Sequence, residues 1–284
     1  MQIGMNLLLW TTQVSPDHYP LLDKIKEWGF DGAEVPIFNV DSDQYRQLGN
    51  QLDAAGLRRT AVTVVTPETN PISESSSVRS KAVDHLKGVV EMCQVSGAEV
   101  LCGPFHSPVG TLVGRGPTRD EWKWGMDVLR QVADTAQQAG VQLALEYLNR
   151  FECYFLNCAE DTVRFIKEAN HPSLGMMYDS FHANIEEKNV SQAIRSCAEQ
   201  TVHVHISEND RSTPGEGNVS WSETFSTLKE VQYDAWFVIE AFGQAMPDLA
   251  AATCIWRRMF PDETYLATQG LQFIKERLHN TEVE

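Results

Sequence analysis

Four short apolar runs in this chain each end in a carboxylate or an imidazole side chain. They are residues 143–146, 176–179, 202–205 and 237–240, which end in Glu146, Asp179, His205 and Glu240. An apolar run of this length is typical of a buried strand. A charged or imidazole group on its last residue is expected to leave the core and point beyond the strand end. Four such endings in succession predict a repeating βα architecture that gathers three carboxylates and one histidine at one opening.

Eight strand-like runs alternate with helical patterns along the chain. Strands are predicted at residues 3–9, 32–36, 59–65, 100–103, 142–146, 174–179, 202–206 and 236–240. Helical spacing of apolar residues predicts helices at 19–28, 83–95, 122–139, 162–169, 225–231 and 264–278. Glycines that can adopt the left-handed conformation are expected to end helices at positions 29, 56, 97 and 140. This alternation predicts a single α/β domain over residues 1–284, folded as a (β/α)8 TIM barrel.

A doubly wound open sheet is the alternative fold. Its dinucleotide-binding form would carry a glycine-rich turn after the first strand, and residues 7–12 contain no glycine. In the barrel, residues 66–80 and 107–119 would form long loops after the third and fourth strands. Because such loops build the site of a barrel, both are expected on its catalytic face.

The composition excludes several classes of protein. A formal net charge of −16 repels nucleic acid and anionic membrane, so neither is an expected partner. No stretch approaches the roughly 18 apolar residues that a spanning helix requires, and the N-terminus lacks the features of a signal peptide. The six cysteines form no CxxC pair and are expected to be reduced thiols, which indicates a cytoplasmic protein.

The four strand endings are candidate metal ligands. In a barrel they would converge from strands five to eight, because the carboxyl ends of all strands face the same opening. Three carboxylates and one imidazole favour Mn²⁺, Mg²⁺ or Co²⁺ over a structural zinc site, which prefers thiolates. Each residue alone has an ordinary alternative as a helix cap or surface group, and a strand histidine such as His203 is usually a core residue. The joint pattern favours the metal site.

Polar residues gather just beyond these strand ends. They are Asn149, Arg150, Glu152, His182, Glu208, Asn209, Asp210 and Arg211. Such a set could line a sugar pocket, or it could consist of helix caps and solvated loops, and the pattern alone leaves both open. Aromatic residues near the strand ends could form apolar walls, although helix packing is expected for at least one tryptophan. These residues are Trp10, Phe105, Trp122, Trp124 and Phe242.

At these positions the chain resembles the D-tagatose 3-epimerase and D-psicose (allulose) 3-epimerase family, within the xylose-isomerase-like barrel superfamily. The resemblance rests on EYLNRFE at residues 146–152 with LN at 156–157, and on DSFHANIEE at 179–187. It extends to HVH at 203–205, NDR at 209–211, PGEG at 214–217 and EAF at 240–242. It spans nearly the whole chain, and its specific motifs lie in the second half.

The resemblance implies roles for individual residues. Glu146, Asp179, His205 and Glu240 would bind the metal, with Mn²⁺ expected and Mg²⁺ or Co²⁺ as alternatives, and Glu146 and Glu240 would also be the two acid/base groups. Glu152, His182 and Arg211 would hold the oxygens at the first carbons of a free ketose. Members of this family commonly form homodimers or homotetramers. The chain departs from the family around Asn6 and at residues 106–109, so the resemblance implies a free ketose without indicating which one.

The paired glutamates fit epimerisation at C3, in which one base removes a proton next to a carbonyl and the other returns it on the opposite face. A metal on the C2 and C3 oxygens would stabilise the enediolate.

A ketose–aldose isomerase is the nearest alternative, because the same site could serve transfer between C1 and C2. Three further classes remain as alternatives: a sugar dehydratase or phosphosugar enzyme, a metal-dependent DNA-repair nuclease, and a non-catalytic sugar- or metal-binding protein. The lack of a phosphate-binding loop argues against the phosphosugar enzyme, and the net charge argues against the nuclease.

Overall fold

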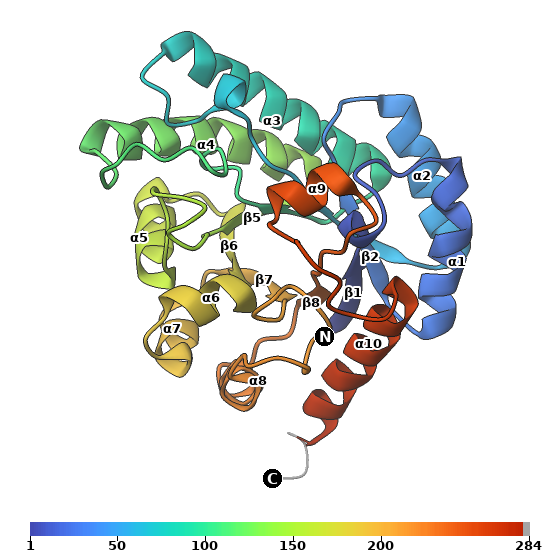
Figure 1. The fold of residues 1–284 in the computed structure, drawn as a ribbon. Helices are drawn as coiled ribbons and strands as arrows, with labels where there is room; N and C mark the ends of the chain where they lie inside the picture. The colour runs from blue at the N-terminus through green and yellow to red at the C-terminus, as the bar shows by residue number, and fades with distance from the viewer. Residues whose placement is uncertain (281–284) are drawn as a thin grey trace.

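The computed structural model describes residues 1–280, and within them eight parallel strands close into a barrel in sequential order (Figure 1). β1 pairs with both β2 and β8, which closes the ring. The strands are β1 Gln2–Asn6, β2 Gly32–Pro36, β3 Arg58–Val62, β4 Val100–Gly103, β5 Gln142–Glu146, β6 Leu174–Asp179, β7 Thr201–Ile206 and β8 Trp236–Ile239. The predicted TIM barrel is confirmed, and the open sheet is excluded.

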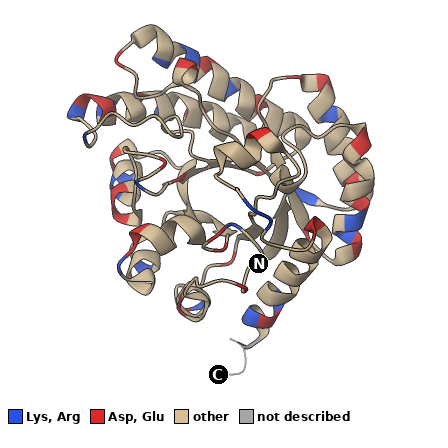
Figure 2. Cartoon of the chain, in the orientation of Figure 1, with Lys and Arg blue, Asp and Glu red and all other residues tan. Residues whose placement is uncertain are grey.

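The helices surround the barrel, except that α9 lies in front of the strands in the view of Figure 1. They are α1 Tyr19–Trp28, α2 Ser42–Ala55, α3 Ser76–Ser96, α4 Arg119–Ala139, α5 Ala159–Ala169, α6 Ser180–Glu186, α7 Val190–Cys197, α8 Trp221–Glu230, α9 Pro247–Ala252 and α10 Glu263–Asn280. Figure 2 shows Lys and Arg interspersed with Asp and Glu on these helices. Among the described residues, no helix combines the length and apolar character needed to cross a bilayer.

The strand bounds were predicted closely, with two corrections. The first strand ends at Asn6 instead of residue 9, because the Asn6 side chain accepts a hydrogen bond from the Leu8 backbone and turns Leu7–Leu9 into a 3-10 helix. The third strand ends at Val62 instead of residue 65. The last residues predicted for each of these strands therefore lie in the segments that follow the strand, at the barrel opening.

The helices needed more correction. No bounds were predicted for α2, whose start is set by the Asp41 side chain accepting from the backbone of Asp43 and Gln44. Helix α3 begins at Ser76, so the loop expected over residues 66–80 is shorter than predicted. The expected glycine endings are confirmed, since glycines 29, 56, 97 and 140 all have positive φ at helix C-termini.

Alternation along each strand decides which residues face the barrel interior. In β5, Leu143 and Leu145 pack in the large apolar cluster between the barrel and the helices, whereas Ala144 belongs to the smaller interior cluster. Because side chains alternate between the two faces of a strand, Glu146 points inward like Ala144. The same alternation holds in β6, where Met177 lies inside and Asp179 follows two residues later.

Helix α4 begins in a capping box centred on Glu121, which also carries an ion pair. Glu121 accepts hydrogen bonds from the Thr118 backbone at 2.7 Å, from Arg115 at 2.8 and 2.9 Å and from the Tyr154 hydroxyl at 2.8 Å. Burial opposes ionisation, but these donors prevail and lower the pKa of Glu121 to about 2. The folded state therefore gains stability from this carboxylate at neutral pH.

We expect Glu121→Gln to lower the melting temperature at pH 7 by roughly 2–6 °C, for a loss of about 1–2 kcal/mol. Since the folded pKa is depressed, the stabilisation is present above the usual value of 4.5 and is lost as pH falls toward 2. Thermal unfolding of both proteins across that range should show the difference between them shrinking. Asp120→Asn, on an exposed residue of the same turn, is the control. A difference that stays constant with pH would contradict this account.

Candidate active site

The structure brings Glu146, Asp179, His205 and Glu240 together at the opening of the barrel. They come from the ends of β5 and β6, from β7, and from the residue after β8, and one ligand atom of each lies within 4.8 Å of the others. All four side chains are buried. The convergence predicted from the strand endings is therefore present in the fold.

Two atoms of this cluster are buried without a hydrogen-bond partner among the described residues. They are Asp179 Oδ2 and His205 Nδ1, which lie 3.5 Å apart. Glu240 Oε1 lies 3.4 Å from the same nitrogen. Buried polar atoms are normally paired, so orphaned atoms facing one another indicate a missing partner. Oxygen-rich ligands with one imidazole suit a divalent cation such as Mn²⁺, and the residues present fit one.

Asp179 is held in place by the helix that follows it. Its Oδ1 accepts from the backbone N–H groups of Phe181 and His182, at 2.6 and 3.2 Å, and so caps the N-terminus of α6. One oxygen thus serves the helix while the other remains available to the cluster. The structure shows the capping function, which was the ordinary alternative for a strand-end acid, and this cap leaves the second oxygen free for the ligand role that the resemblance implies.

The environment of Glu146 favours the protonated form of its carboxyl group more strongly than water does for an exposed glutamate. Burial, helped by the charge of Glu240, raises the pKa of Glu146 to about 7, although a hydrogen bond from His182 opposes the shift. His182 Nε2 lies 3.4 Å from Glu146 Oε1. A carboxyl group near this pKa can both give and take a proton at neutral pH.

The three candidate substrate-binding residues lie beside the cluster and contact one another. Arg211 is 3.3 Å from both carboxylate oxygens of Glu152 and 3.4 Å from His182 Nε2. It also reaches Glu240 Oε2 at 3.3 Å. The guanidinium lies between the rings of Phe181 and Phe242, with its carbon 4.0 and 4.9 Å from their centroids. Arg211 therefore connects the outer residues to the acidic cluster.

The Arg211 backbone is held in a left-handed conformation, with φ of 59°. A bulky residue in this region is strained, and such strain is retained where the surroundings determine it. Here Glu208 holds the loop: its buried carboxylate accepts from the backbone of Gly215 and Val219 and from the indole of Trp221. This loop presents the guanidinium to the barrel opening.

The remaining polar residues divide between the two interpretations left open by the sequence. Asn149 belongs to the site, since its backbone N–H donates to His182 Nδ1 at 2.9 Å and its side chain to Glu152 at 2.8 Å. Arg150 instead pairs with Glu186 at the surface. Glu208, Asn209 and Asp210 accept hydrogen bonds within their own loop.

Of the aromatic candidates, Phe242 lies at the site against Arg211. Trp122 packs against Phe165 and donates to Glu168 on α5, so its role is helix packing. The other three are also packed elsewhere: Trp10 stacks on Trp28, Phe105 is fully buried in the main apolar cluster, and Trp124 lies under Arg79.

Sequence reasoning missed residues that support the cluster from below and from the side. His106 Nε2 lies 2.7 Å from the Glu146 carbonyl oxygen, and Ser107 Oγ contacts its other ring nitrogen at 2.9 Å. Phe181 covers Arg211. Glu34, fully buried in β2, lies 2.7 Å from His205. The only sequence feature that pointed to Glu34 was its position as a single acidic residue inside an otherwise uncharged strand.

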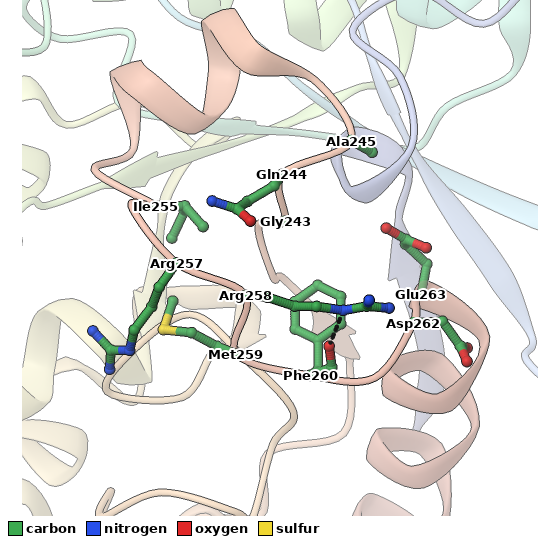
Figure 3. A pocket seen from close by; sticks show the side chains of 10 residues that line it. All are labelled: Gly243, Gln244, Ala245, Ile255, Arg257, Arg258, Met259, Phe260, Asp262 and Glu263. Carbon is green, nitrogen blue, oxygen red and sulfur yellow. Dashed lines mark hydrogen bonds between the residues drawn. The ribbon is translucent and has the colours of Figure 1, made fainter.

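The segment that follows β8 encloses a cavity of about 210 Å³ beside the barrel opening. Figure 3 shows its lining, which includes Gln244 and Ile255. Two of its charged groups serve the loop itself, since Arg258 donates to the Phe260 carbonyl and Asp262 accepts from the Tyr265 backbone at the start of α10. Among the described residues, the lining of this cavity and the acidic cluster of Glu146, Asp179, His205 and Glu240 share no residue.

Comparison with known proteins gives consistent results. The family model described as xylose isomerase-like TIM barrel matches residues 22–277. The chain is 31% identical to an L-ribulose 3-epimerase of Mesorhizobium japonicum over 277 residues, covering 96% of this chain and 93% of that protein. It is 29% identical to a probable ketose 3-epimerase of Synechocystis over 276 residues, covering 97% and 96%. The structure of a D-psicose 3-epimerase with D-tagatose, from Clostridium cellulolyticum, superposes with a TM-score of 0.91 at 26% identity, covering 98% of this chain and 99% of that one.

Proposed function

The chain belongs to the xylose isomerase-like TIM barrel family, and from this membership we propose that it is a metal-dependent 3-epimerase of free ketoses. The substrates proposed are pairs such as D-fructose with D-psicose and D-tagatose with D-sorbose. The observation that carries the proposal is the pair of buried glutamates, Glu146 and Glu240, in one cluster with Asp179 and His205. The names of the similar proteins, which are 3-epimerases of ketoses, support the same reaction.

We propose that Glu146, Asp179, His205 and Glu240 hold the cation. The orphaned atoms of Asp179 and His205 support this assignment. Mn²⁺ is the metal we propose, and the same ligands also suit Mg²⁺ or Co²⁺. When bound, the cation would polarise the substrate carbonyl and stabilise the negative charge that develops on its oxygen.

The two glutamates would carry the proton. One carboxylate removes the proton from C3, and the electron pair of that bond forms the C2–C3 double bond while the carbonyl electrons move to the C2 oxygen. The other carboxyl group then donates a proton to C3 from the opposite face, and the carbonyl re-forms. Burial raises the pKa of Glu146 and a bound cation would act in the opposite direction, so the two glutamates would differ in their readiness to give or take the proton according to how each binds the cation.

The neighbouring residues would hold the sugar during this transfer. Arg211 offers several N–H donors in a rigid plane and is fixed by two aromatic rings. Asn149 donates its backbone N–H to His182 Nδ1, so Nε2 carries the proton of the neutral ring and can donate to a sugar oxygen. Glu152 accepts hydrogen bonds and can receive one from a hydroxyl group. Together these groups would orient C1 to C3 of the ketose.

The test is to incubate the Mn²⁺-loaded enzyme with a panel of free ketoses in D₂O. We expect deuterium at C3 and the appearance of the C3 epimer, detected by NMR and chromatography. An aldose product, with solvent deuterium at its C2, would instead identify a ketose–aldose isomerase. Binding of a ketose with neither exchange at any carbon nor any new sugar product would contradict an enzymatic role. A cytoplasmic location and a homodimer or homotetramer stay predictions, and light scattering on the purified protein tests the oligomeric state.

A further inference from the structure

A buried carboxylate lies inside the barrel beneath the proposed metal ligands, and the proposed chemistry gives it no role. It is Glu34 on β2, which is fully buried. Its two oxygens accept from five side chains, at distances from 2.7 to 3.2 Å. The donors are Asn6 and His205 on Oε1, and Thr60, His203 and Cys102 on Oε2.

Glu34, Cys102, His203 and His205 lie close enough together to suggest a second metal site. The separations argue against it. The two histidine Nε2 atoms lie 2.8 and 2.7 Å from the carboxylate, which are hydrogen-bond lengths. Two ligand atoms about 2.0–2.2 Å from one tetrahedral metal would lie well over 3 Å apart. The group is therefore an anion surrounded by donors.

This arrangement determines which nitrogen of His205 carries a proton. Asn6 and Thr60 also donate to the two oxygens of Glu34, and imidazole is a stronger base than a carboxylate, so the hydrogen shared with His205 belongs on the ring nitrogen and Glu34 accepts it. His205 Nε2 must then carry the hydrogen of the 2.7 Å bond. In the neutral ring the lone pair is on Nδ1, the atom that has no partner and faces Asp179 and Glu240. A metal needs this unprotonated nitrogen.

We propose that Glu34 is a positioning residue of the metal centre, which fixes the tautomer and the direction of His205 so that Nδ1 is presented to the cation. The inference rests on the proposed metal-dependent function. His203 and Thr60, at 2.8 Å each, hold the second oxygen and prevent the carboxylate from rotating. When a carboxylate accepts the second N–H of a metal-bound histidine, its mutation typically weakens metal affinity by about 10–100-fold.

Glu34→Gln tests this role with almost no change of shape. Three donors surround Oε2 and two surround Oε1, so the amide oxygen is expected at the Oε2 position and the NH₂ group opposite His205. The imidazole would then accept at Nε2 and carry its proton on Nδ1, toward the metal. We expect the Mn²⁺ dissociation constant, measured by electron paramagnetic resonance of free Mn²⁺, to rise about 10–100-fold.

Thr60→Val is the matched control, because it removes one donor to Glu34 and leaves the His205 contact in place. Its Mn²⁺ affinity should stay within about threefold of the wild type. A loss equal to that of Glu34→Gln would show a general packing effect and would overturn the proposal.

A measurement on the unaltered chain keeps the proposal testable if Glu34→Gln does not fold. Long-range ¹H–¹⁵N spectra of the Mg²⁺-loaded protein, labelled on histidine, should show the His205 proton on Nε2. A proton on Nδ1 contradicts the proposal, as does wild-type Mn²⁺ affinity in Glu34→Gln. Failure of the wild type to bind Mn²⁺ or Mg²⁺ at all would contradict the proposed function instead.

Discussion

Glu240→Gln is expected to lower the rate of C3 epimerisation by about 10³-fold at saturating Mn²⁺, because the amide cannot take or give the C3 proton. The fold should persist, since Glu240 follows the last strand and its main partners are Arg211 and His205. The substitution also removes a proposed ligand, so Mn²⁺ occupancy must be measured in the same samples. Only the loss that remains at full occupancy reports on proton transfer.

The most specific measurement on this variant is hydrogen exchange catalysed by the glutamate that remains, Glu146. In Glu240→Gln, Glu146 can still remove and return the C3 proton on its own face. We expect solvent deuterium to enter C3 of one epimer without inversion, and Glu146→Gln should show the same behaviour with the other epimer. Glu230→Gln, an exposed acid that pairs with Arg195 on the outer surface, should turn over normally. Full epimerisation by Glu240→Gln would falsify the two-base scheme.

Exhaustive chelation is expected to abolish turnover and to lower the melting temperature, with both restored by Mn²⁺. Three buried carboxylates surround a site in which Asp179 Oδ2 and His205 Nδ1 lack partners, so the cation removes repulsion and satisfies these atoms. At a concentration of about 100 times the dissociation constant, binding adds about 2.7 kcal/mol of stability, which corresponds to a rise of roughly 5–10 °C.

Asp179→Asn separates this metal effect from acid/base chemistry, because Asp179 is proposed as a ligand only. The variant should resemble the chelated protein, with low turnover and a melting temperature that responds weakly to Mn²⁺. The Asn side chain keeps an oxygen that can cap α6, so the helix start is retained. Undiminished turnover in fully metal-free wild type would contradict the metal-dependent mechanism.

Local patterns made most of the fold predictable. Apolar runs marked the strands, and glycines marked the ends of four helices, because both depend on residues close together in the chain. Two of the errors arose where a local polar contact overrode the apolar pattern, and the short helices α6, α7 and α9 were not predicted. The Asn6 side chain ended β1 early, and the Asp41 cap started a helix for which no bounds were predicted.

The candidate site was predictable to the extent that it lies at strand ends. Glu146, Asp179 and Glu240 could be found because parallel strands in a barrel bring their carboxyl ends to one opening. Glu34 was missed because its importance depends on His203 and His205, which lie across the barrel from β2 and far along the chain. The strand pattern alone did not separate Arg150 from Arg211, whereas the family resemblance implied Arg211; in the structure Arg150 pairs with Glu186 and Arg211 lies beside the acidic cluster.

By itself, the sequence determined the barrel and the four residues that meet at its opening, since strand alternation and strand direction follow from local periodicity. The tertiary structure decided which atoms face one another: the orphaned Asp179 Oδ2 and His205 Nδ1, the guanidinium held between Phe181 and Phe242, and the carboxylate beneath them. Tautomers, pKa values and ligand geometry depend on distances of a few ångströms between side chains from different strands. Those distances are set only when the barrel closes.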